Sequence, residues 1–94
     1  MKKTSVVLVF DIGTQSTRAL LVSSEGKILA KAQKGHHPAY VSRKSGWAEQ
    51  DPDDWWMYLK EAIKGAIAKA GIKGTEVDAI GISYQMHGLV LVDK

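Results

Sequence analysis

Two short apolar runs near the start of the chain predict a pair of buried strands. Residues 6–10 and 19–22 are entirely aliphatic or aromatic, which is typical of strands covered on both faces. Only a short polar stretch separates them. We therefore expect the two strands to pair as a hairpin.

A third strand is predicted near an edge of the same sheet. Beyond the turn at residues 24–26, apolar and polar positions alternate through residues 27–33, the pattern of a half-exposed strand. Residues 35–50 are polar and show no period. A loop of this length is longer than most structural connections, so we interpret it as a candidate functional segment.

The loop leads into one amphipathic helix. Asp51 is suited to cap it, Pro52 suits its first position, and Asp53 and Asp54 place negative charge at the positive end of the helix dipole. Gly71 is predicted to end it. The apolar positions recur every three or four residues: Trp55, Leu59, Ala62, Ile63, Ala66, Ile67 and Ala70.

Two further strands are predicted after the helix, at residues 77–83 and 89–92, with a polar turn between them. The resulting order is β-β-β-α-β-β. It predicts an α/β chain with a sheet of about five strands and one main helix.

Composition excludes several classes of function. The chain has 94 residues, 45% of them hydrophobic and 24% charged, which predicts one small soluble domain with a thin core. Its net charge of +3 is dispersed, so we expect no nucleic-acid surface. There is no cysteine for a disulfide or a thiolate metal site. The apolar runs are too short for a signal peptide or a membrane span, so we expect a cytoplasmic protein without a membrane partner.

The turn between the first two strands, residues 10–18, is the strongest indication of chemistry. Asp11 leaves a buried strand and can reach a metal ion or its water shell, while Gly13 allows the backbone to come close to a ligand. Four side chains then supply hydrogen-bond donors for phosphate oxygens: Thr14, Gln15, Ser16 and Thr17. The alternative is an ordinary tight turn in which Asp11 only accepts backbone N–H groups.

Three motifs in this order resemble the FGGY-type carbohydrate kinases, within the ribonuclease-H-like superfamily of actin, the Hsp70-type chaperones and sugar kinases. The motifs are D-I-G-T-Q-S-T-R at residues 11–18, G-W-A-E-Q-D-P at residues 46–52, and G-I-S-Y-Q-M-H-G at residues 81–88. The resemblance implies a ribonuclease-H-like (actin-like ATPase) fold with a mixed sheet. It makes residues 1–94 the N-terminal part of the first such domain, truncated, with the second domain absent.

The resemblance implies ATP and Mg²⁺ as cofactors. In the family the first turn faces the ATP phosphates. Thr14, Gln15 and Ser16 would then contact the β- and γ-phosphates beside Gly13, with Arg18 nearby and Asp11 close to Mg²⁺ through its water shell. Arg18 has the alternative role of a surface charge at a strand end.

The resemblance also implies residues that contact the sugar. Gln85, Met86 and His87 resemble the version of the third motif found in xylulose kinases, which favours a linear sugar, first D-xylulose giving xylulose 5-phosphate. Ribulose, gluconate, fuculose and rhamnulose are the alternatives. Trp47, Glu49 and Gln50 belong to a segment near the sugar cleft or its rim in the family, although Glu49 equally suits a role ahead of the helix cap.

The family's catalytic base lies further along the chain than Lys94, and no residue here matches it. We expect the 94-residue chain alone to be inactive and, with a sheet face and an edge uncovered, to form homo-oligomers. The alternatives are a non-catalytic nucleotide-binding or interaction module of the actin-like superfamily and an actin-type or chaperone-type ATPase. Adjacent His36 and His37 point to opposite sides of an extended chain, and no third ligand is spaced to join them in a metal site.

Overall fold

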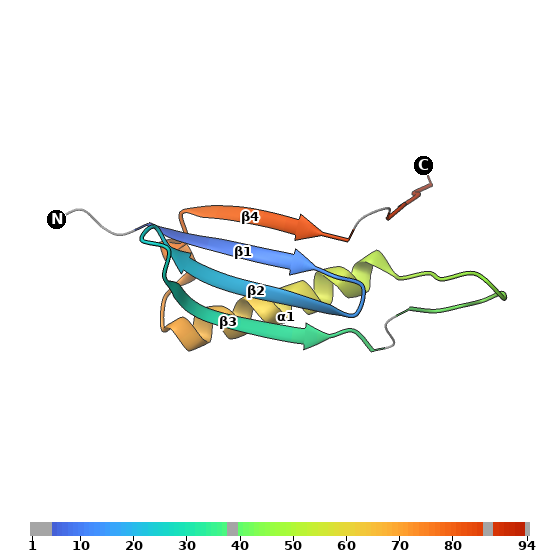
Figure 1. Cartoon of the computed structure of the whole chain (residues 1–94), viewed down its shortest axis with the longest axis horizontal. Helices are drawn as coiled ribbons and strands as arrows, with labels where there is room; N and C mark the ends of the chain where they lie inside the picture. The colour runs from blue at the N-terminus through green and yellow to red at the C-terminus, as the bar shows by residue number, and fades with distance from the viewer. Residues whose placement is uncertain (1–4, 38–39, 86–87, 94) are drawn as a thin grey trace.

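A computed structural model of the chain, which describes residues 5–37, 40–85 and 88–93, is an α/β fold of one mixed sheet and one long helix (Figure 1). Its elements are β1 (Val6–Ile12), β2 (Ser16–Ser23), β3 (Ile28–Gly35), α1 (Pro52–Ala70), a 3₁₀ turn (Gly74–Glu76) and β4 (Ala79–Tyr84). No helix among the described residues is both long enough and apolar enough to cross a lipid bilayer.

The strand order is β3-β2-β1-β4, with the first three strands antiparallel and β4 parallel to β1. The predicted hairpin is confirmed by β1 and β2, and the predicted edge strand by β3. The parallel crossover places the ends of β1 and β4 at the same edge of the sheet. The first and third sequence motifs therefore meet there.

One face of the sheet forms the core. Side chains alternate along β1 and β2, so that Val6, Leu8 and Phe10 lie on the same face as Ala19 and Leu21. Helix α1 covers this face with its own buried stripe, Leu59, Ala62 and Ala66. The helix lies mainly over β2 and β3 and less over β1 (Figure 1).

Both predicted ends of the helix are confirmed. The Asp51 carboxylate accepts a hydrogen bond from the backbone N–H of Asp53 at 2.9 Å, with Pro52 at the start of α1. Gly71 ends the helix in the left-handed region at φ 68°, where its N–H donates to the carbonyls of Ile67 and Ala68. The Asp51 cap fixes where the loop from the sheet enters the helix.

The predicted fifth strand at residues 89–92 is wrong, and the sheet has four strands among the described residues. Residues 88–93 form no strand, and Leu89 and Leu91 are 80% and 82% exposed. An apolar run becomes a strand only where a neighbour completes its hydrogen bonds, and β4 pairs on its β1 side alone in this part of the chain.

The predicted loop is confirmed as an excursion beyond the end of the sheet (Figure 1). Its two arms touch through a short antiparallel bridge between Val41 and Glu49, with both backbone hydrogen bonds formed at 2.7 and 2.8 Å. Gly46 lies at φ 86°, a conformation that favours glycine. The loop returns the chain to the edge where β1 and β4 end.

Candidate functional site

The turn between β1 and β2 is tight, and its tip faces solvent. The Gly13 N–H donates to the Ser16 carbonyl at 2.9 Å, which leaves Thr14 and Gln15 exposed at the tip. A Cβ on Gly13 would stand 3.1 Å from that carbonyl oxygen, so a side chain there would crowd the turn. Ser16 accepts a hydrogen bond from the Gln33 amide at 3.1 Å. The turn thus presents hydroxyl and amide groups at one edge of the sheet.

Asp11 and Arg18 face each other in the β1–β2 register, on the sheet face opposite α1. Asp11 is half-buried, and its carboxylate has no hydrogen-bond partner among the described residues. An ordinary tight turn would use this carboxylate to accept backbone N–H groups, so the observed geometry favours a ligand-facing role for Asp11.

The Thr14 carbonyl is held from two sides behind the tip of the turn. It accepts a hydrogen bond from Nε2 of Gln50 at 2.7 Å and one from Nδ1 of His36 at 3.1 Å. A carbonyl oxygen has two lone pairs, so these two donors satisfy it fully. The backbone of the turn is therefore anchored by side chains that come from a different part of the chain.

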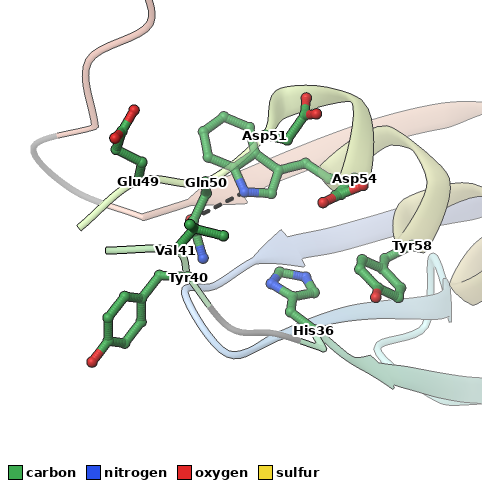
Figure 2. Close-up of a pocket in the computed structure, with 9 residues that line it drawn as sticks. His36, Tyr40, Val41, Glu49, Gln50, Asp51, Asp54 and Tyr58 are labelled. Atoms are coloured by element: carbon green, nitrogen blue, oxygen red, sulfur yellow. Dashed lines mark hydrogen bonds between the residues drawn. The ribbon is translucent and has the colours of Figure 1, made fainter. Parts of the chain in front are cut away.

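Gln50 also joins this turn to the third sequence motif and to the helix. Its Oε1 accepts from the Gln85 amide at 2.8 Å and from the Trp55 indole N–H at 3.1 Å, the latter drawn as the dashed line in Figure 2. The Gln85 backbone N–H donates to the Ile12 carbonyl at 2.9 Å, which fixes Gln85 beside the end of β1. Three motifs far apart in sequence thus meet at one side chain.

An open groove of about 560 Å³ lies beside this junction. Its polar wall contains Glu49, Gln50 and Gln85, and its apolar wall contains Leu89 and Val90. Met86 and His87, the other predicted sugar contacts, lie outside the described residues. The residues on either side of them, Gln85 and Gly88, both line the groove, which makes it the candidate sugar side of the site.

The two predicted contacts from the loop have different surroundings. Glu49 lines the groove, and its carboxylate lies 3.9 Å from Nε of Arg43. Trp47 is 52% exposed, with the Lys44 ammonium 4.9 Å from its ring centre, and does not line the groove. The structure therefore brings Glu49 to Gln85 and leaves Trp47 further out on the loop.

A second cavity of about 50 Å³ lies behind Gln50, between the loop and the first turns of α1 (Figure 2). His36, Tyr58, Gln50 and Asp54 are among its lining residues. This volume holds a water molecule or two and is too small for a sugar or a nucleotide. Within the part of the chain that the structure describes, no three His, Asp or Glu side chains gather as metal ligands.

His36 was not predicted as part of the site, and Gln50 was predicted only as a member of a segment near the sugar cleft. Gln50 lies inside the second motif. Its position between an exposed loop and a capped helix was the feature of the sequence that could have indicated a role in the site. His36 carried no such signal, because its burial depends on β2, the turn and α1 packing around it. Trp55, interpreted as packing, is half-buried as expected and also donates its indole N–H to Gln50.

Comparison with known proteins gives one consistent result. Residues 6–94 match the N-terminal domain of the FGGY family of carbohydrate kinases. The chain is 34% identical over 88 residues to a xylulose kinase of Bacillus subtilis and 41% identical over 88 residues to a glycerol kinase of Caldanaerobacter subterraneus subsp. tengcongensis. These matches cover 94% of this chain and 17% of each relative.

The fold agrees with the sequence match. A crystal structure of a xylulose kinase from Brucella ovis superposes with a TM-score of 0.80 at 30% identity, over 88% of this chain and 17% of that one. The predicted ribonuclease-H-like, actin-like ATPase fold is confirmed by such kinase neighbours. The chain belongs to the FGGY family of carbohydrate kinases.

Proposed function

We propose that this chain forms the phosphate-binding turn and part of the sugar groove of an ATP-dependent carbohydrate kinase, which transfers the ATP γ-phosphate to a hydroxyl of a linear sugar, in first place D-xylulose. One observation carries the proposal. Gln50 hydrogen-bonds both the Thr14 carbonyl and the Gln85 side chain, so the turn and the groove are parts of one site. An enzyme that joins a nucleotide to a sugar needs that adjacency.

The groups at the turn fit a nucleotide with its magnesium ion. Thr14 and Gln15 expose a hydroxyl and an amide, and the tight backbone at Gly13 holds both at the tip of the turn. The Asp11 carboxylate is oriented away from the core and unpaired among the described residues, as a ligand to the water shell of Mg²⁺ must be. Bound ATP would supply the phosphoryl group, and Mg²⁺ would neutralise its charge.

The residues of this chain position the ATP phosphates and do not take part in the covalent chemistry. Phosphoryl transfer depends on charge neutralisation and alignment more than on covalent participation of the protein. Donors at Thr14, Gln15 and Ser16 suit the non-bridging oxygens of the β- and γ-phosphates, and Arg18 adds a positive charge across from Asp11. The base that takes the proton from the sugar hydroxyl is expected from another part of the enzyme.

The groove supports a small polyhydroxylated acceptor. About 560 Å³ exceeds the volume of a five-carbon sugar, and an amide and a carboxylate on one wall suit hydroxyl groups, while Leu89 and Val90 suit a carbon chain. Met86 and His87 favour xylulose over glycerol, because in glycerol kinases the resemblance places an Arg-Glu pair at these two positions. The relatives include both kinds of kinase.

A non-catalytic nucleotide-binding module of the actin-like superfamily is the alternative. It would need the turn at residues 13–16, but it would have no use for a polar groove joined to that turn through Gln50 and Gln85. The groove therefore favours the kinase.

The test is ADP release by the intact enzyme with a panel of acceptors: D-xylulose, D-ribulose, D-gluconate, glycerol, L-fuculose and L-rhamnulose. We expect the highest kcat/KM with D-xylulose. In the same enzyme, His87→Ala should raise the KM for the sugar about tenfold and leave the KM for ATP unchanged, because one hydrogen bond to a hydroxyl is lost. Preference for glycerol would reject the xylulose assignment, and ADP release independent of every acceptor would reject the kinase.

A further inference from the structure

His36 is a buried polar residue directly behind the tip of the phosphate-binding turn. It is 4% exposed, and both of its ring nitrogens are hydrogen-bonded: Nε2 to the Thr17 hydroxyl at 2.6 Å and Nδ1 to the Thr14 carbonyl at 3.1 Å. Its backbone N–H donates to the Gln15 carbonyl at 2.7 Å. One residue thus holds three points of the hairpin that the proposed function assigns to ATP.

The partners of His36 fix its tautomer. A carbonyl oxygen can only accept, so Nδ1 must carry a proton and donate it to Thr14. In the neutral imidazole the Thr17 hydroxyl, itself fully buried, then donates to Nε2. Tyr58 of α1 stacks on the ring with centroids 4.9 Å apart and planes 24° from parallel, which holds the imidazole in this orientation.

One peptide bond, between Thr14 and Gln15, connects the His36 hydrogen bonds to the surface of the turn that faces the nucleotide. The Thr14 carbonyl and the Gln15 N–H belong to the same planar trans peptide, so they point in opposite directions. Because His36 and Gln50 draw the carbonyl inward, the Gln15 N–H is turned outward from the tip. This N–H has no protein partner among the described residues, and Gln15 is exposed.

We infer that His36 is a positioning residue for phosphate recognition: as the Nδ1–H tautomer it holds the Thr14–Gln15 peptide with its N–H directed at a nucleotide phosphate. The inference rests on the proposed function. His36 touches neither ATP nor sugar itself, and acts through the backbone that it orients. A backbone N–H held in advance donates to a phosphate oxygen without the cost of ordering the turn on binding.

Two substitutions distinguish the contribution of Nδ1 from that of Nε2. His36→Asn places an amide N–H near the position of Nδ1 and can still donate to Thr14, whereas His36→Gln reaches only toward the position of Nε2 and Thr17. His36→Leu removes both contacts at similar size. His37→Asn is the matched control, because the His37 ring is exposed and forms no hydrogen bond to the turn among the described residues.

The experiment measures the Kd of a fluorescent ADP analogue, the KM values for ATP and D-xylulose, and the Tm of each variant in the intact enzyme. We expect His36→Leu and His36→Gln to weaken nucleotide binding about tenfold with the sugar KM unchanged, and His36→Asn to stay within about threefold of the parent. His37→Asn should match the parent. If His36 had a purely structural role, all three His36 variants would have a lower Tm, and His36→Asn and His36→Gln would not differ in their affinity for the ADP analogue.

Equal nucleotide affinity in His36→Asn and His36→Gln would overturn the inference. If the His36 variants do not fold, Thr17→Val keeps the imidazole and its bond to the Thr14 carbonyl and removes the hydroxyl that holds the other side of the ring through Nε2. It should then weaken binding of the ADP analogue about threefold, and an unchanged Kd would overturn the inference. A parent enzyme that binds the analogue but phosphorylates no sugar would reject the proposed function and leave the His36 test intact.

Discussion

A single side-chain amide, that of Gln50, donates to the first motif and accepts from the third. An amide can do this, because its nitrogen donates to the Thr14 carbonyl while its oxygen receives N–H groups from Gln85 and Trp55. The direction of each bond is thus set by the atoms at its two ends. A carboxylate of the same shape would keep the two bonds to oxygen and lose the third, because neither it nor the Thr14 carbonyl can donate.

The variant Gln50→Glu tests this reading. A carboxylate oxygen in place of Nε2 would face the Thr14 carbonyl, so a hydrogen bond becomes a repulsion between two acceptors. We expect the KM for ATP to rise about tenfold in the intact enzyme, with the bonds to Gln85 and Trp55 retained.

The matched control is Gln33→Glu, which adds the same charge close to the turn. Gln33 donates to the Ser16 hydroxyl, and a hydroxyl can rotate to donate to a carboxylate instead. Because that rotation takes one donor away from the phosphates, the ATP KM should rise by about threefold, less than in Gln50→Glu. Equal effects in the two variants would show that added charge, and not the lost bond, is responsible.

The sequence predicted the residues of the site that act through their own local pattern. Asp11 and Gly13 are candidates from the sequence because an acid and a glycine follow a strand directly, and Gln85 is one because the third motif follows another strand. The junction at Gln50 and the burial of His36 were not predictable, because each depends on which segments the tertiary fold brings together. Hydrogen bonds between residues 22 and 36 positions apart leave no period in a sequence.

At the level of elements, the same distinction separates the strands. Residues 6–10 and 19–22 were predicted correctly because each finds its partner within a hairpin, and the helix because its caps are local. Residues 89–92 have the same apolar character but no strand beside them in the described structure. Apolar character predicts burial, whereas a strand also requires a neighbour.

The packing of α1 on β3 depends on the absence of a side chain at Gly65. A Cβ at this position would stand 3.2 Å from the Cβ of Ala32, closer than ordinary van der Waals contact. Glycine weakens a helix interior, so its presence in the middle of α1 is explained by this close approach to the sheet. The contact sets how near the helix lies to the edge strand.

Gly65→Val should therefore lower the free energy of unfolding by about 2 kcal/mol, since the added branches have no space and must push α1 from β3. Urea denaturation followed by far-UV circular dichroism measures the change. Ala68→Val, at an exposed position on the same helix, is the control and should cost about 0.5 kcal/mol from helix propensity alone. Similar losses in both variants would contradict the packing explanation.

At the scale of the whole molecule, the sheet is covered on one side and only in part. The radius of gyration is 15.7 Å, against about 12 Å for a compact chain of this length. Ile80, Ile82 and Tyr84 of β4 lie on the same face as the core residues of β1, yet α1 does not extend over them and they are 61%, 61% and 72% exposed. The core therefore continues into an apolar stripe at the edge of the sheet.

An exposed apolar stripe on an edge strand favours pairing between copies, because association buries the stripe and also completes the hydrogen bonds of the edge. We expect the 94-residue chain to self-associate, so that light scattering across a concentration series gives a mass above the 10.3 kDa of one chain. Ile82→Lys should return it toward the monomer, since a buried ammonium opposes association at the stripe. Ala68→Lys adds the same charge on the exposed side of α1 and should leave the mass unchanged. A mass of 10.3 kDa at every concentration would show that the stripe alone is too small to hold two copies together.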